Sequence, residues 1–184
     1  MVDDNTQVVV RNLVNHKVVY LLPETHRKVV FAPFQERRVP AGELRMINYT
    51  TGGSNLIHNF LCIKNDELRE EFNIDPEMIE YDWTLDDIKK ALTTEDLDVL
   101  LDALEYGPEG IRQMLIDYAI EWRIPDTNRR KAITDITGVQ VNRIIELMEQ
   151  AEVYRGEEVA TEPVGGRRRS QKKEAARSGR RVQH

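Results

Sequence analysis

The sequence predicts an α+β fold, in which a small N-terminal antiparallel β-meander with short helices precedes a bundle of about five short helices. Three observations lead to this prediction. Short runs rich in Val, Tyr and Phe occupy the first 40 residues, helical spacing of apolar residues dominates residues 84–151, and that spacing ends near Glu152. We therefore expect a β-meander/α subdomain over residues 1–75, a helical bundle over residues 84–151 and a flexible, disordered basic tail over residues 152–184.

The predicted strands are four runs of β-branched and aromatic residues, separated by turn-like segments: Val8–Val10, Lys17–Leu22, Lys28–Phe31 and Arg37–Val39. A sheet this small needs a partner on its apolar face, and the downstream helices can provide one. His16 and His26 fall at turns without an accompanying carboxylate pattern, so we expect solvent-exposed side chains and not metal ligands.

Two short helices are predicted next, from Glu43 to about Tyr49 and from Asn55 to Phe60, before a strand that includes Cys62. The segment TTGGS between them lacks the Lys-Ser/Thr ending of a phosphate loop and follows a helix, which favours a helix-to-helix turn. Cys62 is the only cysteine, so no intrachain disulfide can form. Its apolar strand, with no histidine at a suggestive spacing, predicts a buried and inert thiol.

Capping signals mark the connection to the helical region. Asn65 or Asp66 can cap a short helix, whereas Pro76 argues against helix and predicts an extended connection. Thr84 followed by Asp87 resembles a capping box that opens the next helix. The side chains expected to point inward from that helix are Leu85, Ile88 and Leu92.

Residues 97–122 predict a helical hairpin that supplies most of the core. Apolar residues recur at helical spacing on both sides of a Gly-Pro pair: Leu97, Leu100, Leu101 and Leu104, then Ile111, Met114, Leu115, Tyr118 and Trp122. Gly107 suits a left-handed exit from the first helix, and Pro108 suits the first turn of the second. Thr94 is expected to cap the hairpin.

Asp98, Asp102 and Glu105 share the opposite face of the first hairpin helix. General acid–base catalysis needs two carboxyl groups in unlike environments, and metal catalysis needs ligands that converge from several elements. A single helix face meets neither requirement. We expect a solvated acidic stripe or a docking surface for a basic partner, and we assign no catalytic, cofactor-binding or metal-binding residue.

Residues 128–148 have some helix-turn-helix character, with Gly138 between a helix capped by Asp126 or Thr127 and a final helix. The side chains available to bases and phosphates are Gln140, Asn142 and Arg143, with Arg129, Arg130 and Lys131 on the preceding helix. However, Glu146, Glu149 and Glu152 would face phosphates. A plain helical hairpin is therefore favoured, with an apolar side formed by Val141, Ile144, Ile145 and Met148.

Charge is distributed unevenly along the chain. Residues 165–184 carry eight cations and one carboxylate, a net charge of +7, so the total of −6 leaves −13 on residues 1–164. The cations are Arg167, Arg168, Arg169, Lys172, Lys173, Arg177, Arg180 and Arg181. Three uses are open: sequence-independent contact with phosphates, docking on the acidic face of a neighbouring copy or another protein, and a solubilising end.

Composition is that of an ordinary globular protein, with 40% apolar and 32% charged residues. No run is long enough to span a bilayer, and the acidic N-terminus lacks the basic-then-apolar order of a signal peptide. We therefore expect no membrane association, and a location in a cytoplasm or in something assembled there.

Four segments together resemble a family of small virion structural proteins of tailed bacteriophages: NLVNHKVVYLLPETHRKVVFAPFQERRVPAGELRMINYTTGGSNLIHNFLCI, EYDWTLDDIKKAL, LDVLLDALEYGPEGIRQMLIDYAIEW and KAITDITGVQVNRII. The resemblance covers about residues 7–150, rests on general pattern, and leaves out the basic tail. It implies a non-enzymatic role in many copies, and it supplies no functional residues.

The first functional hypothesis is thus a structural or assembly component of a phage particle, in the head or head-to-tail region. It would be made in the host cytoplasm, contact other virion proteins or further copies of itself, and use its tail on a neighbour or on packaged DNA. The alternative is a small helix-turn-helix regulator that binds nucleic acid. An enzyme is the least favoured class, and no cofactor is expected.

Overall fold

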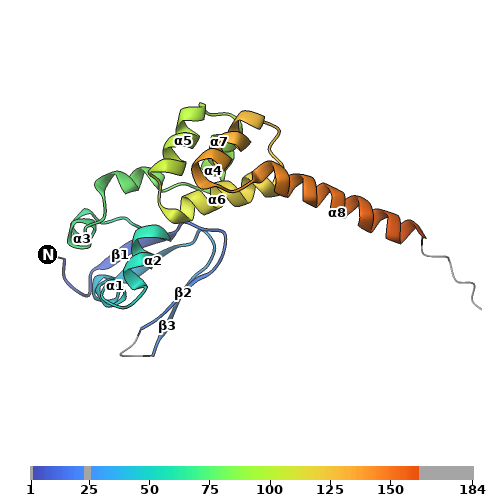
Figure 1. Ribbon diagram of the computed structural model, residues 1–184. Helices are drawn as coiled ribbons and strands as arrows, with labels where there is room; N and C mark the ends of the chain where they lie inside the picture. The colour runs from blue at the N-terminus through green and yellow to red at the C-terminus, as the bar shows by residue number, and fades with distance from the viewer. Residues whose placement is uncertain (1, 23–25, 162–184) are drawn as a thin grey trace, which may run out of the picture. The chain divides into compact units, whose positions relative to one another are not determined.

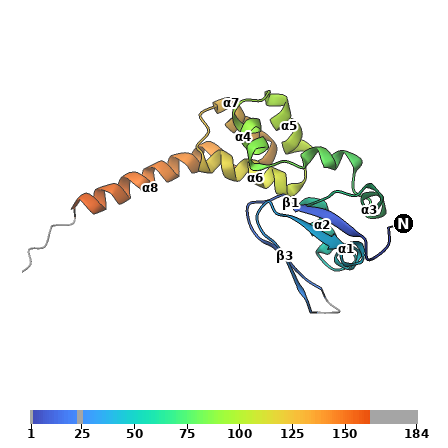
Figure 2. The ribbon, with the colours of Figure 1, turned by 180° about the vertical axis from the view of Figure 1, so that it is seen from behind.

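The computed structural model describes residues 2–22 and 26–161, and it has the predicted α+β architecture (Figure 1). The chain divides into two compact units, Met1–Met148 and Glu149–His184. Within the first unit, the strands and short helices gather at one end and four of the bundle helices at the other, as Figure 2 also shows from behind.

Five described strands form two separate antiparallel sheets. β1 (Gln7–Asn12) lies between β4 (Glu36–Pro40) and β5 (Leu61–Ile63), while β2 (Val18–Leu21) and β3 (Lys28–Phe31) form a two-stranded ribbon. The four predicted strands and their antiparallel pairing are confirmed. The meander order is wrong, because β1 pairs with the fourth and fifth strands and not with the second.

Asn12 gives the physical reason for this strand order. Its side chain is fully buried at the end of β1, and its Nδ2 donates to His16 O at 2.8 Å and to Ala32 O at 2.9 Å. Its Oδ1 accepts from Val14 N at 3.1 Å. The Asn12 side chain therefore binds the residues just before β2 and just after β3. These bonds hold the two ends of the β2–β3 ribbon beside the end of β1.

Three short helices follow the strands: α1 (Ala41–Asn48), α2 (Gly53–Asn59) and α3 (Asp66–Glu71). The predicted turn between the first two is confirmed. Gly52 has a φ of +80°, and a Cβ on Gly53 would lie 1.8 Å from Ile47 O, so both positions require glycine. The Asn65 side chain caps α3 by accepting from Leu68 N at 2.9 Å, as predicted.

The expected extended connection at Pro76 is wrong, because residues Pro76–Tyr81 form a 3₁₀ helix, η1. Pro76 occupies the first helical position, where its missing N–H costs no hydrogen bond. The Asp75 side chain precedes it and accepts from Glu77 N at 3.0 Å. Proline here begins a helix instead of preventing one.

The bundle has the predicted five helices: α4 (Leu85–Thr93), α5 (Leu97–Glu105), α6 (Glu109–Glu121), α7 (Thr127–Thr137) and α8 (Val141–Thr161). The capping box is confirmed, since Asp87 N donates to Thr84 Oγ1 at 3.4 Å and Thr84 N to Asp87 Oδ2 at 2.9 Å. Ile88 and Leu92 are fully buried, but Leu85 is exposed, contrary to prediction. Thr94 ends α4, and Asp96 instead precedes α5.

Gly107 in the central hairpin does not have the predicted backbone conformation. The left-handed glycines of the described residues are Gly52 and Gly138, so Gly107 does not make the expected left-handed exit. It is needed for space, because a Cβ there would lie 2.4 Å from Ala103 O. Pro108 then stands directly before α6 as its N-cap residue.

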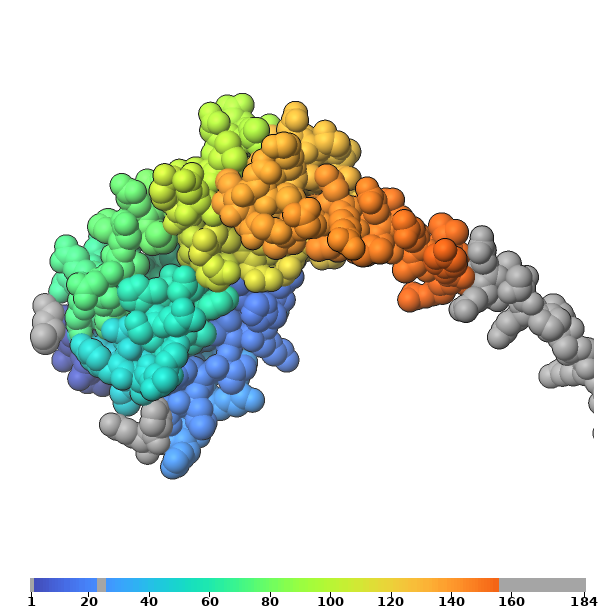
Figure 3. Space-filling model, in the orientation of Figure 1, coloured from blue at the N-terminus to red at the C-terminus, as the bar shows by residue number. Residues whose placement is uncertain are grey.

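One hydrophobic cluster joins the strands to the helices of the first unit, including Val8, Val10, Leu44, Leu100, Met114 and Ile133. The start of α6 lies tightly against the end of α2, since a Cβ on Gly110 would meet Asn59 O at 2.7 Å. The teal and yellow surfaces of these helices touch in Figure 3. The expected helical cover for the small sheet is thus present.

Helix α8 continues to Thr161, whereas the sequence predicted that periodicity and structure end at Glu152. Helical structure thus extends into the segment that the sequence assigned to the tail. No helix among residues 2–22 and 26–161 is long and apolar enough to cross a membrane.

Candidate interaction surface

Helix α8 presents large apolar side chains to solvent. Val141 and Ile145 are buried, as predicted, whereas Leu147 is 55% exposed. In the second unit, Val153 is 60% and Tyr154 69% exposed. Exposed apolar side chains that form a contiguous patch are typical of an interaction surface. The sequence predicted the buried side of this helix but missed Leu147, Val153 and Tyr154, because helical spacing does not show how exposed the remaining apolar residues are.

The α7–α8 pair has the local geometry expected of a turn between two helices. The Asp126 side chain caps α7 by accepting from Asn128 N at 2.8 Å and from Arg129 N at 3.3 Å. Gly138 ends α7 with a φ of +76°. Gln140, Asn142 and Arg143 are exposed at the start of α8.

The cations of α7 are engaged within the protein. Arg129 is only 7% exposed, and its guanidinium donates to Ala91 O at 2.5 Å and to Glu95 O. These carbonyls lie at and beyond the last turn of α4, where no intrahelical donor is available. Arg129 therefore caps another helix and does not present its charge to a phosphate.

The next two cations of α7 are also paired. Arg130 Nε donates to Ile124 O at 2.5 Å, and its Nη1 donates to Asn142 Oδ1 at 3.4 Å. Lys131 Nζ lies 2.5 Å from Asp135 Oδ2. A helix-turn-helix interface would have to break or share these contacts to reach the DNA backbone.

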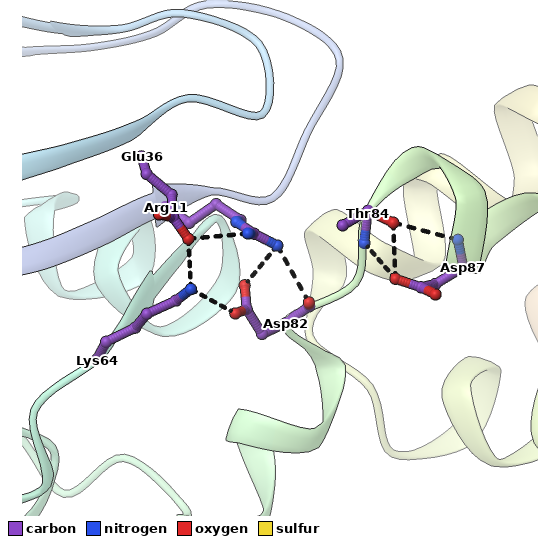
Figure 4. A network of polar contacts seen from close by, with 6 residues as sticks. All are labelled: Arg11, Glu36, Lys64, Asp82, Thr84 and Asp87. Carbon is purple, nitrogen blue, oxygen red and sulfur yellow. Dashed lines mark hydrogen bonds and ion pairs between the residues drawn. The ribbon is translucent and has the colours of Figure 1, made fainter.

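A four-residue ionic network joins the three-stranded sheet to Asp82, which follows η1 and precedes the capping box of α4 (Figure 4). Arg11 lies 2.8 Å from Glu36 Oε1 through Nη2 and 3.1 Å from Asp82 Oδ1 through Nη1. Lys64 Nζ contacts Glu36 and lies 2.9 Å from Asp82 Oδ2. Hydrogen bonds from Lys64 and Arg11 hold the pKa of Glu36 below its usual value. Two cations and two carboxylates balance, so the network acts as a structural clamp.

A second cluster surrounds Arg45 on α1. Its Nε lies 2.6 Å from Glu71 Oε1, its Nη1 bonds Asp4, and its Nη2 donates to Val2 O at 2.8 Å. The hydrogen bond to Glu71 is the main cause that raises the pKa of Arg45, and the same bond lowers the pKa of Glu71. This cluster ties the N-terminal segment and α3 to α1.

The acidic stripe on α5 is exposed, as expected, but one of its carboxylates forms a hydrogen bond with another part of the protein. Asp98, Asp102 and Glu105 are exposed, and Asp102 Oδ2 accepts from Tyr81 Oη at 2.7 Å. Burial and this hydrogen bond raise the pKa of Tyr81. The contact spans 21 residues and has no local sequence signal.

The remaining candidate residues lie where the sequence placed them. Cys62 is buried in β5, and burial raises the pKa of its thiol to about 11. His16 and His26 are exposed. Among residues 2–22 and 26–161, no group of three or more His, Cys, Asp or Glu side chains could hold a metal ion.

The basic residues predicted to bind a partner lie outside the described residues: Arg167, Arg168, Arg169, Lys172, Lys173, Arg177, Arg180 and Arg181. Comparison of the chain with protein-family models, with curated proteins and with solved structures finds no match.

Proposed function

We propose that this protein is a non-enzymatic structural or assembly component of a tailed-bacteriophage virion, located in the head or head-to-tail region and present in several copies. Its folded part would contact other virion proteins or further copies of itself. Its basic C-terminal residues would dock on a neighbouring subunit or on packaged DNA. The observation that carries the proposal is the exposure of Leu147, Val153 and Tyr154 on α8.

The use of charge in the folded part supports this role. The ionic clusters around Arg11 and Arg45 join separate segments of the chain, and Arg129 caps a helix. These ionisable groups therefore hold the fold in place and are not free to bind a partner. The negative charge of residues 1–164 and the positive charge of residues 165–184 also suit contact between unlike surfaces of neighbouring subunits.

The helix-turn-helix alternative is favoured by one observation, the exposure of Gln140, Asn142 and Arg143 beyond the Gly138 turn. Against it stand the internal contacts of Arg129 and Arg130. A regulator would bind one duplex in preference to random DNA, and replacing the three exposed residues would abolish that preference.

Sedimentation of full-length protein tests the assembly role. Leu147→Glu introduces a charge into the apolar surface of α8, and we expect it to weaken self-association or particle incorporation by roughly tenfold. Gln150→Glu is the matched control, because it adds the same charge at an exposed position of the same helix. Equal self-association and equal particle incorporation of the two variants would contradict the proposal.

Removal of residues 165–184 tests the basic segment. We expect reduced incorporation into particles with little change in melting temperature. Sedimentation with and without DNA at about 50 mM and about 200 mM salt then separates the two partners, because phosphate binding falls steeply over that range. Normal assembly of the shortened chain would contradict the role given to these residues.

A further inference from the structure

We infer that a groove beside α1 is the docking site for the basic segment of residues 165–181 from a second copy of this chain. The inference rests on the proposed function, because it names the surface that a neighbour's basic segment would occupy. Four features of the described residues and of the segment's sequence support it: the shape of the groove, its charge, its exposed aromatic ring and the reach of the segment.

The groove lies where the N-terminal segment passes the start of α1. Ala41 N donates to Thr6 O at 2.9 Å and Gly42 N to Asp4 O at 3.0 Å, which holds the two walls together. The cavity has a volume of about 720 Å³. Its lining includes Asp4, Gly42, Glu43, Arg45, Met46 and Tyr49.

The charge in the groove suits a cationic occupant. Arg45 is the cation of the lining, and its guanidinium is held by the carboxylates of Glu71 and Asp4 and by Val2 O. The lining carries two carboxylates, Asp4 and Glu43, and one cation, Arg45, which leaves a net charge of −1. The donors of Arg45 are occupied by the oxygens named above, and Glu43 forms an ion pair with Arg27 from outside the lining. The Asp4 side chain is still 73% exposed, so it remains accessible to a further donor.

Tyr49 supplies an aromatic surface at the end of α1. It is 75% exposed, and Met46, one turn earlier, is packed against the core. A guanidinium group stacks on an aromatic face while its aliphatic stem covers apolar surface. A groove lined by both an exposed carboxylate and an exposed ring therefore fits arginine side chains better than neutral or anionic ones.

The segment of residues 165–181 has the matching chemistry. It carries all eight cations of the last twenty residues, including three consecutive arginines from Arg167 to Arg169. Residues 162–184 could span at most about 75 Å when extended. That length exceeds the roughly 40 Å width of a folded domain of this size, so the segment can reach another subunit.

The test uses the full-length chain in a mixed sample. One population is labelled with ¹⁵N, and the other is unlabelled and carries a nitroxide on Ser178→Cys, with the buried Cys62 left in place. We expect the amide signals of Gly42 and Tyr49 to broaden, because the nitroxide and the isotope meet only between copies. Broadening confined to other surfaces, broadening only when label and isotope share one chain, or broadening absent while the protein binds DNA would each overturn the inference.

A pair of matched variants measures the contribution of the ring. Tyr49→Ala should weaken self-association roughly two- to fivefold, the range expected for an exposed cation–π contact. Tyr106→Ala, which removes a tyrosine that is 62% exposed on another helix end, should leave it unchanged. If Tyr49→Ala has no effect while Leu147→Glu still dissociates the protein, the groove assignment fails and the proposed function stands. If neither variant has an effect, both fail.

Discussion

Replacing Arg129 by methionine should destabilise the fold strongly, although the residue lies in a segment with helix-turn-helix character. The change keeps most of the aliphatic stem but removes the guanidinium donors of Ala91 O and Glu95 O. Hydrogen bonds from a charged donor contribute about 1.5–3 kcal/mol each, so the loss of two predicts a decrease of about 3–6 kcal/mol in the free energy of unfolding. For a chain of this size that corresponds to a melting temperature lower by about 6–24 °C.

Urea and thermal unfolding of the Arg129→Met variant measure the loss. Lys131→Met is the control, because Lys131 is paired with Asp135 on the surface and its side chain is 72% exposed. An exposed pair of this kind contributes less than about 0.5 kcal/mol. A decrease below about 1 kcal/mol for Arg129→Met, together with weaker binding to DNA, would refute the capping role and favour the regulator alternative.

Three further predictions follow from the packing and ionisation of single residues. Gly107→Ala should lower the free energy of unfolding by about 1–3 kcal/mol in urea titrations, because its Cβ would collide with Ala103 O; an unchanged midpoint would contradict this. Glu71→Gln should lower the free energy of unfolding at pH 7. In urea titrations, the difference in free energy of unfolding between this variant and the original protein should become smaller as the pH is lowered. The reason is that Arg45 keeps the folded pKa of Glu71 below the ordinary 4.5, so this stability is complete above that pH and is lost as the pH falls through the folded pKa. Cys62 should resist a thiol reagent at pH 8 until urea unfolds the protein, since burial raises its pKa to about 11; rapid modification of folded protein would argue against that burial.

The local elements were predictable because their determinants lie within a few residues of one another. Thr84 and Asp87 bond across three positions, and Asp126 caps the helix that it directly precedes. Gly138 ends that helix at the left-handed position where glycine is favoured. Short-range capping of this kind can be predicted from the sequence, and so can the helical spacing of the core leucines.

The errors concern interactions between distant segments. Asn12 bonds Ala32 across 20 residues and sets the strand order, which the alternation of Val and Tyr within each strand does not specify. Pro76 is a local exception, because after the capping residue Asp75 it begins η1 instead of preventing a helix. For the candidate surface, the sequence predicted the buried side of α8 that includes Val141, but only the structure showed that Leu147 is exposed.

The sequence by itself determined the α+β class, the positions of most helices and strands, the caps at Asn65, Thr84 and Asp126, and the separation of negative from positive charge. These follow from composition and from contacts between near neighbours in the chain. The tertiary structure decided the strand order, the capping of α4 by Arg129, the groove beside α1 and the exposed side of α8. Each of these depends on which distant residues meet, and side-chain type alone does not state whether an arginine is paired inside the protein or free to bind a partner.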